Sequence, residues 1–146
     1  MYTIENATIR DLFQLSRLEK ECFGYDAWPF IDLVGILIIP GIIRIKASVG
    51  PRMIGFISGD IGNPNSTGWI TSIGVAGEFR RQGIGKKLLE ACEEKMTSPE
   101  IRLTVRKSNQ AAIRMYLQNG YQSYESWAEY YNGGEDGLVM RKLRVI

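Results

Sequence analysis

The sequence predicts an α+β fold built as a single domain. Segments with the apolar alternation of β-strands are interleaved with segments that carry apolar residues at helical spacing, which is typical of one sheet covered by helices. The chain has 146 residues, of which 45% are hydrophobic, and this length suits one hydrophobic core. No internal repeat, linker or low-complexity tract divides it, so we expect one domain over residues 1–146.

The individual elements follow from periodicity and turn signals. Gly50–Arg52 joins two apolar segments and predicts an antiparallel hairpin, while Thr8, Asn109 and Gly120 are placed to cap helices. The expected elements are strands at Tyr2–Ile4, Ile42–Val49, Met53–Asp60, Trp69–Val75, Ile101–Arg106, Tyr121–Trp127 and Gly137–Leu143, and helices at Leu12–Phe23, Trp28–Ile38, Ile84–Met96 and Asn109–Leu117.

Composition excludes several kinds of site. The sequence contains no histidine, which excludes a Ser-His-Asp or Cys-His catalytic site and an imidazole-ligated zinc site. Its two cysteines, Cys22 and Cys92, form no Cys-x-x-Cys pair, so they give no disulfide or zinc framework and suit a reducing compartment. We therefore predict no metal site, and any general base must be a carboxylate, a tyrosine, a lysine or water.

Charge and hydropathy predict a cytoplasmic protein without a nucleic-acid or membrane partner. The formal net charge is only +2, from 18 basic and 16 acidic residues, so no overall field favours a polyanion. The most apolar stretch, Leu33–Ile43, contains Pro40 and is far shorter than the ~20 residues of a membrane helix. No basic segment leading into an apolar run follows Met1, so we expect no secretory signal.

One segment, GVAGEFRRQGIGKKLLEACEEKM (Gly74–Met96), lies where a predicted strand meets a predicted helix. It is not a Walker A loop, because Lys87 stands where a hydroxyl is needed, and it is not a dinucleotide fingerprint, because Leu88 replaces the third glycine. Glycines that let backbone approach an anion, followed by the free N–H groups of a helix N-terminus, still predict a pyrophosphate site. The alternative is a tight turn at Gly83 and Gly85 with the cations in solvent.

Together with LTVRKSNQAAIRMYLQNGY (Leu103–Tyr121), this junction resembles the GCN5-related N-acetyltransferases, and within them the RimI-type protein N-terminal acetyltransferases. The similarity runs from ATIRDLFQLSRLEKECF through WITSIGVAGEFRRQGIGKKLL to YYNGGEDGLVM and so covers most of the chain. It implies the fold of that family, a mixed and mostly antiparallel twisted sheet of about six or seven strands. Helices flank this sheet, and two central strands splay apart.

The resemblance implies acetyl-CoA as the donor of the acetyl group. By position in the motifs, the backbone of Ile73, Gly74 and Val75 would line the pantetheine arm, and Asn109 would contact the cofactor beyond the pyrophosphate. The residues expected to hold the pyrophosphate are Arg80, Arg81, Gln82, Gly83, Ile84, Gly85 and Lys86.

Tyr116 occupies the position of the tyrosine that protonates the departing CoA thiolate in the family. The alternative is a core aromatic on the apolar helix stripe of Ile113 and Leu117. The match to the family motif favours the role of general acid.

The general base is where the sequence departs from the family. RimI-type enzymes carry a glutamate in the segment LEVR, whereas this chain reads LTVR and has Thr104 there. An α-amine with a pKa near ~8 is about a tenth neutral at pH 7 and needs a base far less than a lysine near ~10.4. A water held by Thr104, or the carboxylate of Glu19 or Glu21, would then accept the proton.

The resemblance also predicts the acceptor. The segment AEYYNGGEDG would frame a peptide N-terminus, with Tyr130 and Tyr131 lining the groove, unless both are ordinary hairpin aromatics. We expect direct acetyl transfer to the α-amine of a protein or peptide, with ribosomal proteins as one acceptor class. Two alternatives stay open: a small amine or lysine side chain as acceptor, and a non-catalytic acetyl-CoA-binding module. A monomer and a dimer both fit.

Overall fold

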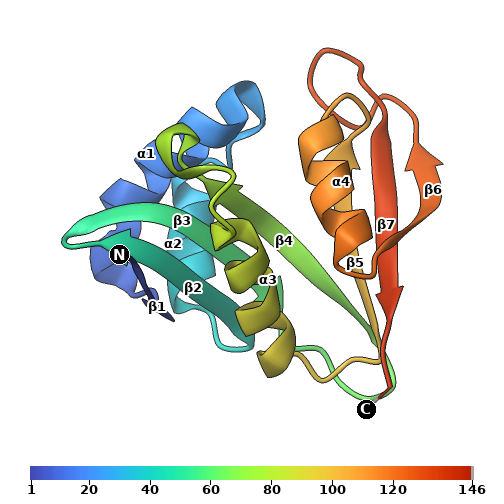
Figure 1. Ribbon diagram of the computed structural model, residues 1–146, viewed down its shortest axis with the longest axis horizontal. Coiled ribbons are helices and arrows are strands. Elements are labelled where there is room, and N and C mark those ends of the chain that lie inside the picture. The colour runs from blue at the N-terminus through green and yellow to red at the C-terminus, as the bar shows by residue number, and fades with distance from the viewer. Residues whose placement is uncertain (146) are drawn as a thin grey trace.

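A seven-stranded mixed sheet forms the centre of the molecule in a computed structural model that describes residues 1–145 (Figure 1). The strands are β1 (Thr3–Asn6), β2 (Ile42–Val49), β3 (Arg52–Asp60), β4 (Thr67–Val75), β5 (Glu100–Arg106), β6 (Gln122–Trp127) and β7 (Gly137–Leu143). Their spatial order is β1-β2-β3-β4-β5-β7-β6. Strands β2 and β3 form the predicted antiparallel hairpin, and the α+β class is confirmed.

The sheet divides between β4 and β5, the two strands that pair in parallel. Pairing covers only three positions, from Thr67 opposite Glu100 to Trp69 opposite Arg102. Beyond Trp69 the two strands diverge (Figure 1), so residues 70–75 of β4 pair with no strand on that side. We call this unpaired stretch the splay, and it confirms the central feature of the expected fold.

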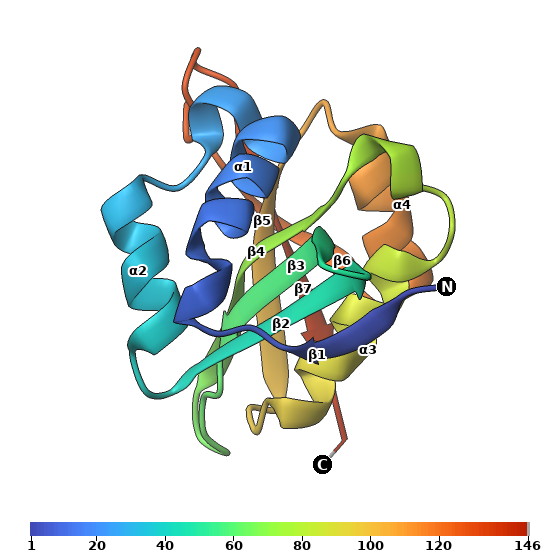
Figure 2. The same cartoon turned by 90° about the vertical axis from the view of Figure 1, so that its left-hand side faces the viewer.

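Helices cover both faces of the sheet (Figure 2). Helices α1 (Leu12–Phe23) and α2 (Phe30–Ile38) lie on one face, and α3 (Ile84–Lys95) and α4 (Gln110–Gln118) lie on the other. We call these the α1 face and the α3 face. Successive side chains of a strand point to opposite faces, so Phe56 packs in the core under α1 whereas Ile57 packs in the core under α3.

The helix ends follow the expected caps. Thr8 forms a capping box with Asp11 at a short 3-10 turn ahead of α1, and Asn109 Oδ1 accepts an N–H of the first turn of α4 at 3.2 Å. Gly120, with a φ of 94°, lies just past the end of α4, as a left-handed residue does. No helix within residues 1–145 has both the length and the apolar character to cross a membrane.

Two details of the expected helices were wrong. Helix α2 begins at Phe30 and not at Trp28. Trp28 precedes Pro29, and the residue before a proline is kept out of the helical region. Leu117, expected on the buried stripe of α4, is 52% exposed. Tyr116 and Ile113 face the core instead.

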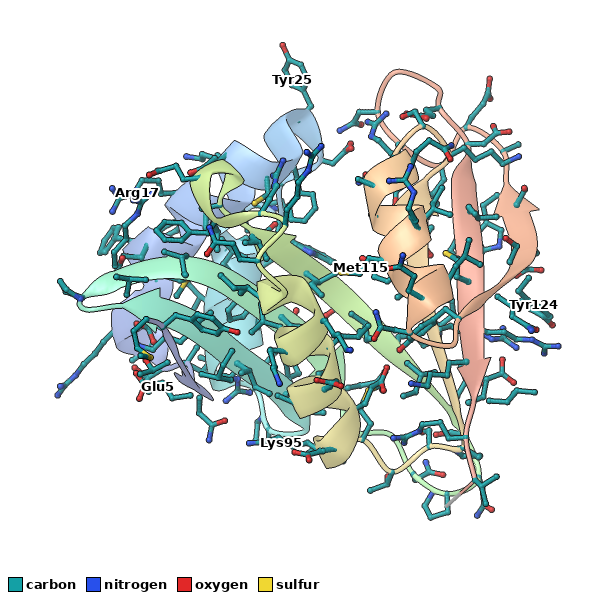
Figure 3. All side chains as sticks on the ribbon, in the orientation of Figure 1. Glu5, Arg17, Tyr25, Lys95, Met115 and Tyr124 are labelled. Atoms are coloured by element: carbon teal, nitrogen blue, oxygen red, sulfur yellow. The ribbon has the colours of Figure 1, made fainter. Side chains whose placement is uncertain are left out.

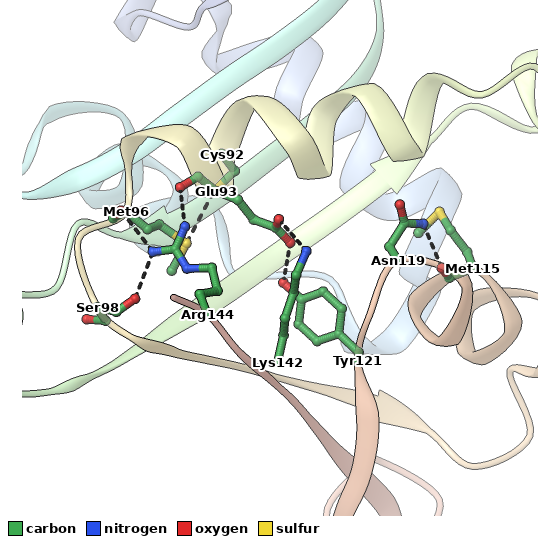
Figure 4. A network of polar contacts seen from close by, with 9 residues as sticks. All are labelled: Cys92, Glu93, Met96, Ser98, Met115, Asn119, Tyr121, Lys142 and Arg144. Carbon is green, nitrogen blue, oxygen red and sulfur yellow. Dashed lines mark hydrogen bonds and ion pairs between the residues drawn. The ribbon is translucent and has the colours of Figure 1, made fainter. Parts of the chain in front are cut away.

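A polar network fastens α3 to the C-terminal half of the sheet (Figure 4). Glu93 of α3 accepts hydrogen bonds from the Tyr121 hydroxyl at 2.7 Å and from Lys142 Nζ at 2.8 Å. Arg144 donates to the carbonyl oxygens of Glu93, Met96 and Ser98 at 2.7–2.9 Å. The C-terminal half of α3 is thereby fixed to β7 and to Arg144, which follows β7.

Candidate active site

The backbone of β4 offers free hydrogen-bonding groups along the splay. Ala76 N–H donates to Ile54 of β3 at 2.8 Å, and residues of an antiparallel pair alternate in the direction of their backbone groups. Gly74 therefore also faces β3, whereas Ile73 and Val75 turn N–H and C=O towards the diverging β5. Such an unpaired strand edge binds extended ligands that carry amide groups.

The N-terminus of α3 has the backbone geometry of an anion-binding site. Gly83 at the N-cap has a φ of 80° and Arg81 has a φ of 64°, and residues in this left-handed region turn successive N–H groups to one side. None of the N–H groups from Arg81 to Lys86 has an acceptor within residues 1–145. Free N–H groups at the positive end of a helix dipole bind phosphate.

The cations around this helix end are not neutralised by the protein. Arg81, Lys86 and Lys87 are exposed, and none of them makes an ion pair with a described residue. Arg80 lies back along the strand, where its Nε donates to Val75 O at 2.9 Å. Gln82 is also exposed.

Two predicted cofactor residues contribute backbone rather than side chain. Ile84 is 1% exposed and fills the core, so only its N–H can meet an anion. At Gly85 a Cβ would lie 2.9 Å from Met115 Sδ, the end of a long side chain that comes from α4. Figure 3 shows Met115 reaching from α4 into the space between the two halves of the sheet.

The other end of α3 has the opposite character. A cavity of about 510 Å³ lies between this end and β7. Its lining includes Glu90, Glu93 and Glu94, and Lys142 there is already paired with Glu93 at 2.8 Å. Because carboxylates repel phosphate, the N-terminal end of α3 suits an anion better than this end does.

Tyr116 is a core aromatic with a free hydroxyl. It is 5% exposed, and its ring packs edge-on against Tyr121 with centroids 6.0 Å apart. Burial, and to a smaller degree the nearby Tyr131, raises the pKa of Tyr116, whose hydroxyl has no hydrogen-bond partner within the described chain. The hydroxyl is therefore protonated at neutral pH, as a proton donor must be. The side chain of Asn109, unlike the Tyr116 hydroxyl, already has a partner in the protein, because its Oδ1 caps helix α4.

Thr104 lies on the polar side of β5, together with Arg102 and Arg106, and this side forms part of the α1 face. A Cβ at Gly137 would lie 2.9 Å from Thr104 Cγ2 and 3.1 Å from the Tyr130 ring. Thr104 and Tyr130 are therefore neighbours across a residue without a side chain. The position of the family's base adjoins a predicted acceptor residue.

The two carboxylates named as substitute bases have different surroundings. Glu19 is 3% exposed and accepts hydrogen bonds from the Ser72 hydroxyl at 2.5 Å and from Trp28 N at 3.2 Å. Burial raises the pKa of Glu19. Glu21 instead accepts from Gly77 N at 3.0 Å, beyond the end of β4. Of the two, Glu19 lies against the splay.

Four aromatic side chains form a row along the α1 face. Trp69 of β4 and Trp127 of β6 have ring centroids 5.8 Å apart, Trp127 and Tyr130 5.1 Å, and Tyr130 and Tyr131 4.9 Å. We call these four the aromatic row. Burial, followed by the Tyr130 hydroxyl, raises the pKa of Tyr131 to about 12. Apolar surface ending in hydroxyl groups suits an extended peptide.

Sequence reasoning missed half of the aromatic row and its surroundings. Trp69 and Trp127 read as ordinary strand residues, because aromatic residues are common in strands. It also missed Asp26 and Arg106, which form an ion pair although 80 residues separate them in the chain. No local pattern links residues that far apart. Two signals pointed to Arg106 itself, though not to its partner: the polar alternation of β5 and the segment LTVR, which ends at Arg106.

The chain belongs to a known family of enzymes, the acetyltransferase (GNAT) family, whose model matches residues 9–121. The expected resemblance to the GCN5-related N-acetyltransferases is confirmed. The protein is therefore an acetyltransferase by family.

Among its relatives, the N-terminal acetyltransferase B complex catalytic subunit NAA20 of Arabidopsis thaliana is 36% identical over 109 residues. That match covers 70% of this chain but only 63% of the longer plant protein. N-alpha-acetyltransferase 20 of Dictyostelium discoideum is 31% identical over 148 residues, which is 97% of this chain and 86% of the relative.

A solved structure shares the fold. Arabidopsis thaliana NAA60 in complex with acetyl-CoA superposes with a TM-score of 0.86 at 17% identity, covering 98% of both chains. Within residues 1–145, no group of three or more Cys, Asp or Glu side chains is arranged to hold a metal ion.

Proposed function

We propose that this protein transfers the acetyl group of acetyl-CoA to the α-amino group of a protein or peptide N-terminus. The observation that carries this proposal is the splay between β4 and β5. It has an anion-binding helix end on one side and a polar, aromatic surface on the other, so that two substrates can meet through it. Similarity to an N-alpha-acetyltransferase over 97% of the chain supports the same acceptor.

The residues present fit acetyl-CoA, which supplies an acetyl group activated as a thioester. The free N–H groups from Arg81 to Lys86 suit its pyrophosphate, and the backbone groups of Ile73 and Val75 suit the amides of its pantetheine arm. Val75 O is engaged by Arg80, so an amide that binds there replaces this contact. The released guanidinium is then free to meet the phosphates beside it.

We assign the chemical steps to two groups on opposite sides of the splay. The N–H of Val75, directed away from β3, stabilises negative charge on the carbonyl oxygen that is attacked. The Tyr116 hydroxyl, kept protonated by burial, donates its proton to the departing thiolate. Holding both reactants in place supplies most of the acceleration, because it turns a bimolecular reaction into a unimolecular one.

We propose that Glu19, rather than Glu21, takes the proton of the attacking amine. Glu19 hydrogen bonds to Ser72 within the splay, and its raised pKa makes it a stronger base than an exposed carboxylate. Thr104 lacks a titratable group but lies beside Tyr130, where it orients the acceptor. Since an α-amine is partly neutral at pH 7, an indirect base is sufficient.

The proposal is tested with pairs of peptides that each contain one internal lysine. One member of each pair has a free α-amine and the other an α-amine that is already blocked. Mass spectrometry after incubation with acetyl-CoA should find the acetyl group on the free α-amine alone. Equal acetylation of the blocked peptides would replace the proposal with a lysine or small-amine acetyltransferase.

The non-catalytic alternative gives a different result in the same experiment. A pure acetyl-CoA-binding module would be protected by acetyl-CoA against thermal unfolding and would acetylate none of the peptides. The free Tyr116 hydroxyl argues for catalysis, because a hydroxyl without a structural partner has no other role in the core.

The finer setting of this activity is also a proposal. The RimI-type motifs support ribosomal proteins as one acceptor class. Two free thiols, Cys22 and Cys92, support a reducing, cytoplasmic location. Mass spectrometry of protein N-termini from cells with and without the enzyme would identify the natural acceptors.

A further inference from the structure

Arg106, the last residue of β5, makes four contacts that the proposed chemistry does not use. Its Nε donates to Asp26 at 2.5 Å, one terminal nitrogen donates to Glu135 at 2.7 Å, and the other donates to Asn132 O at 2.9 Å. The guanidinium carbon also lies 4.8 Å from the centroid of the Tyr131 ring. Each of the three guanidinium nitrogens therefore donates a hydrogen bond to the protein.

These contacts join three separate parts of the chain. Asp26 belongs to η2 (Gly24–Asp26), the 3-10 turn that follows α1, and Asn132 and Glu135 belong to the connection between β6 and β7. A second link runs the same way, because Asn132 Nδ2 donates to Tyr25 O at 2.9 Å. Both links cross from the N-terminal half of the sheet to the C-terminal half, at the end where β4 and β5 are farthest from pairing.

The chemistry of the cluster favours a fixed geometry. A planar guanidinium that binds two carboxylates and a carbonyl holds all three in one arrangement, which a lysine cannot do. Ser108 and Arg106 lower the pKa of Glu135, so this carboxylate stays ionised. Ser108 N also donates to Glu135 at 2.7 Å, which anchors the cluster to β5. Tyr25, next to Asp26, extends into solvent (Figure 3) and takes no part through its ring.

We infer that Arg106 is a positioning residue for the acceptor, which sets the width of the acceptor groove by clamping η2 to the β6–β7 connection. This inference rests on the proposed function. Through its stacking on Tyr131 it holds the end of the aromatic row at a fixed distance from the splay. Arg106 contacts neither the N-terminus of α3 nor Tyr116 directly. Tyr131, on which it stacks, does lie near Tyr116, so we expect the acceptor groove to be affected most and the binding of acetyl-CoA least.

The test is Arg106→Gln, with kinetics for a free-α-amine peptide and the Kd of acetyl-CoA. A groove that is no longer held at one width binds the peptide more weakly in the ground state and in the transition state alike, so we expect kcat/KM for the peptide to fall about 10- to 100-fold, mainly through KM. The Kd of acetyl-CoA should change less than about threefold. Arg106→Lys should recover little, because a compact ammonium lacks the planar, widely spaced donors of a guanidinium and the flat face that stacks on Tyr131.

Arg102→Gln is the matched control. Arg102 lies on the same side of β5, forms an ion pair with Glu100 and stacks on an aromatic ring, Tyr124, at 4.5 Å. It does not reach η2 or the β6–β7 connection. A purely structural role for arginines on this strand would make the two variants alike, whereas the clamp predicts a raised KM in Arg106→Gln alone.

Asp26→Asn and the Arg106→Gln/Asp26→Asn double variant test the partner. Because both residues act through one link, the double variant should have the KM of Arg106→Gln and not the product of the two effects. Fully multiplicative effects on KM would overturn the clamp.

Hydrogen exchange separates this inference from the proposed function. In Arg106→Gln, amides of residues 24–28 and 128–136 should exchange faster than in the native protein, while those of Arg102→Gln should not. Faster exchange with no wild-type acetylation of α-amines would reject the proposed function and keep the clamp. An active enzyme with unchanged exchange and unchanged KM in Arg106→Gln would reject the clamp alone.

Discussion

The two sides of the splay are built in different ways. The site proposed for the pyrophosphate comes from one short segment, Arg81–Lys86, through its free backbone N–H groups. The side that fits the acceptor comes from five separate segments: α1 with η2, β4, β5, β6 and the β6–β7 connection. One side depends on local backbone conformation, and the other depends on tertiary contacts such as those of Arg106.

This difference follows from the two ligands, because the donor is the same molecule in every reaction whereas the acceptor differs from one peptide to the next. A pyrophosphate is the same in every turnover, so a site made from one helix end can bind it without help from distant residues. An acceptor peptide has a variable sequence, and loops that are held by side-chain contacts can change without disturbing the fold. Substitutions on the two sides should therefore change different kinetic constants.

The largest effect is expected where the two sides meet, at Tyr116. Tyr116→Phe should lower kcat about 100- to 10,000-fold, because proton donation to the thiolate is lost. The Kd of acetyl-CoA and the melting temperature should stay nearly unchanged, since the hydroxyl has no partner to lose. Steady-state kinetics and thermal unfolding measure these quantities.

Tyr121→Phe is the control for this variant. Tyr121 packs against Tyr116, but its hydroxyl donates to Glu93 at 2.7 Å, so Tyr121→Phe should lose about 1 kcal/mol of stability and keep its kcat. Loss of kcat in both variants, or in neither, would remove the assigned role of Tyr116.

The donor side is tested at Gly83, whose φ of 80° is strained for any other residue. Gly83→Val should weaken acetyl-CoA binding about 10- to 100-fold, as expected when charge-assisted hydrogen bonds worth about 1.5–3 kcal/mol are lost. The KM for the peptide should not change. Calorimetric titration with acetyl-CoA measures the Kd.

Gly50→Val has the matching backbone strain at a distant site. Gly50 has a φ of 55°, and a Cβ there meets nothing within 4 Å, as at Gly83. It lies in the β2–β3 hairpin turn, so the variant should lose stability without losing affinity for acetyl-CoA. Weakened affinity in both variants would mean that strain, and not the anion site, causes the effect.

A smaller effect is expected at Thr104. Without a direct base, kcat/KM should fall about tenfold for each pH unit below the pKa of the amine, near ~8. Thr104→Glu adds a carboxylate that accepts this proton, so the acidic limb of the profile should move to lower pH and the rate one unit below pH 7 should rise about tenfold. A pH–rate profile with one peptide measures the shift.

Thr104→Gln is the control, because it has the size of glutamate without a titratable group. It should keep the native pH profile. If Thr104→Glu and Thr104→Gln have the same profile, the position does not reach the amine.

The smallest effect concerns stability and Glu19. Because burial raises the pKa of Glu19, the native state binds more protons than the unfolded state above the ordinary glutamate pKa of about 4.3. Its contribution to stability is therefore present below that value and is lost as pH rises through the raised pKa. Glu19→Gln should be within about 1 kcal/mol of the native protein at pH 4 and should lack this decline at higher pH.

Chemical denaturation of both proteins across pH 4–8 measures the difference. Parallel pH dependences would mean that Glu19 has the same pKa in the native and the unfolded state. In that case Glu19 would not be a stronger base than an exposed carboxylate.

The sequence predicted locally determined elements well and long-range contacts poorly, for a physical reason. Every strand was located to within two residues at each end, and the caps at Thr8 and Asn109 were correct, because turns, caps and the left-handed Gly83 depend on near neighbours. Tyr130 and Tyr131 were found only through a family motif. Trp69, Trp127 and the Asp26–Arg106 pair depend on strand order, which local patterns do not encode.

The splay is fastened at both of its ends. At one end β4 still pairs with β5, and Glu93 ties α3 to β7. At the other end Arg106 and Asn132 bridge to η2. Because the splay is held at both ends, its width should be constant. We therefore expect the distance between the reacting groups to be fixed before either substrate binds. If the proposed function holds, we expect the two products to leave through opposite faces without any opening of the sheet.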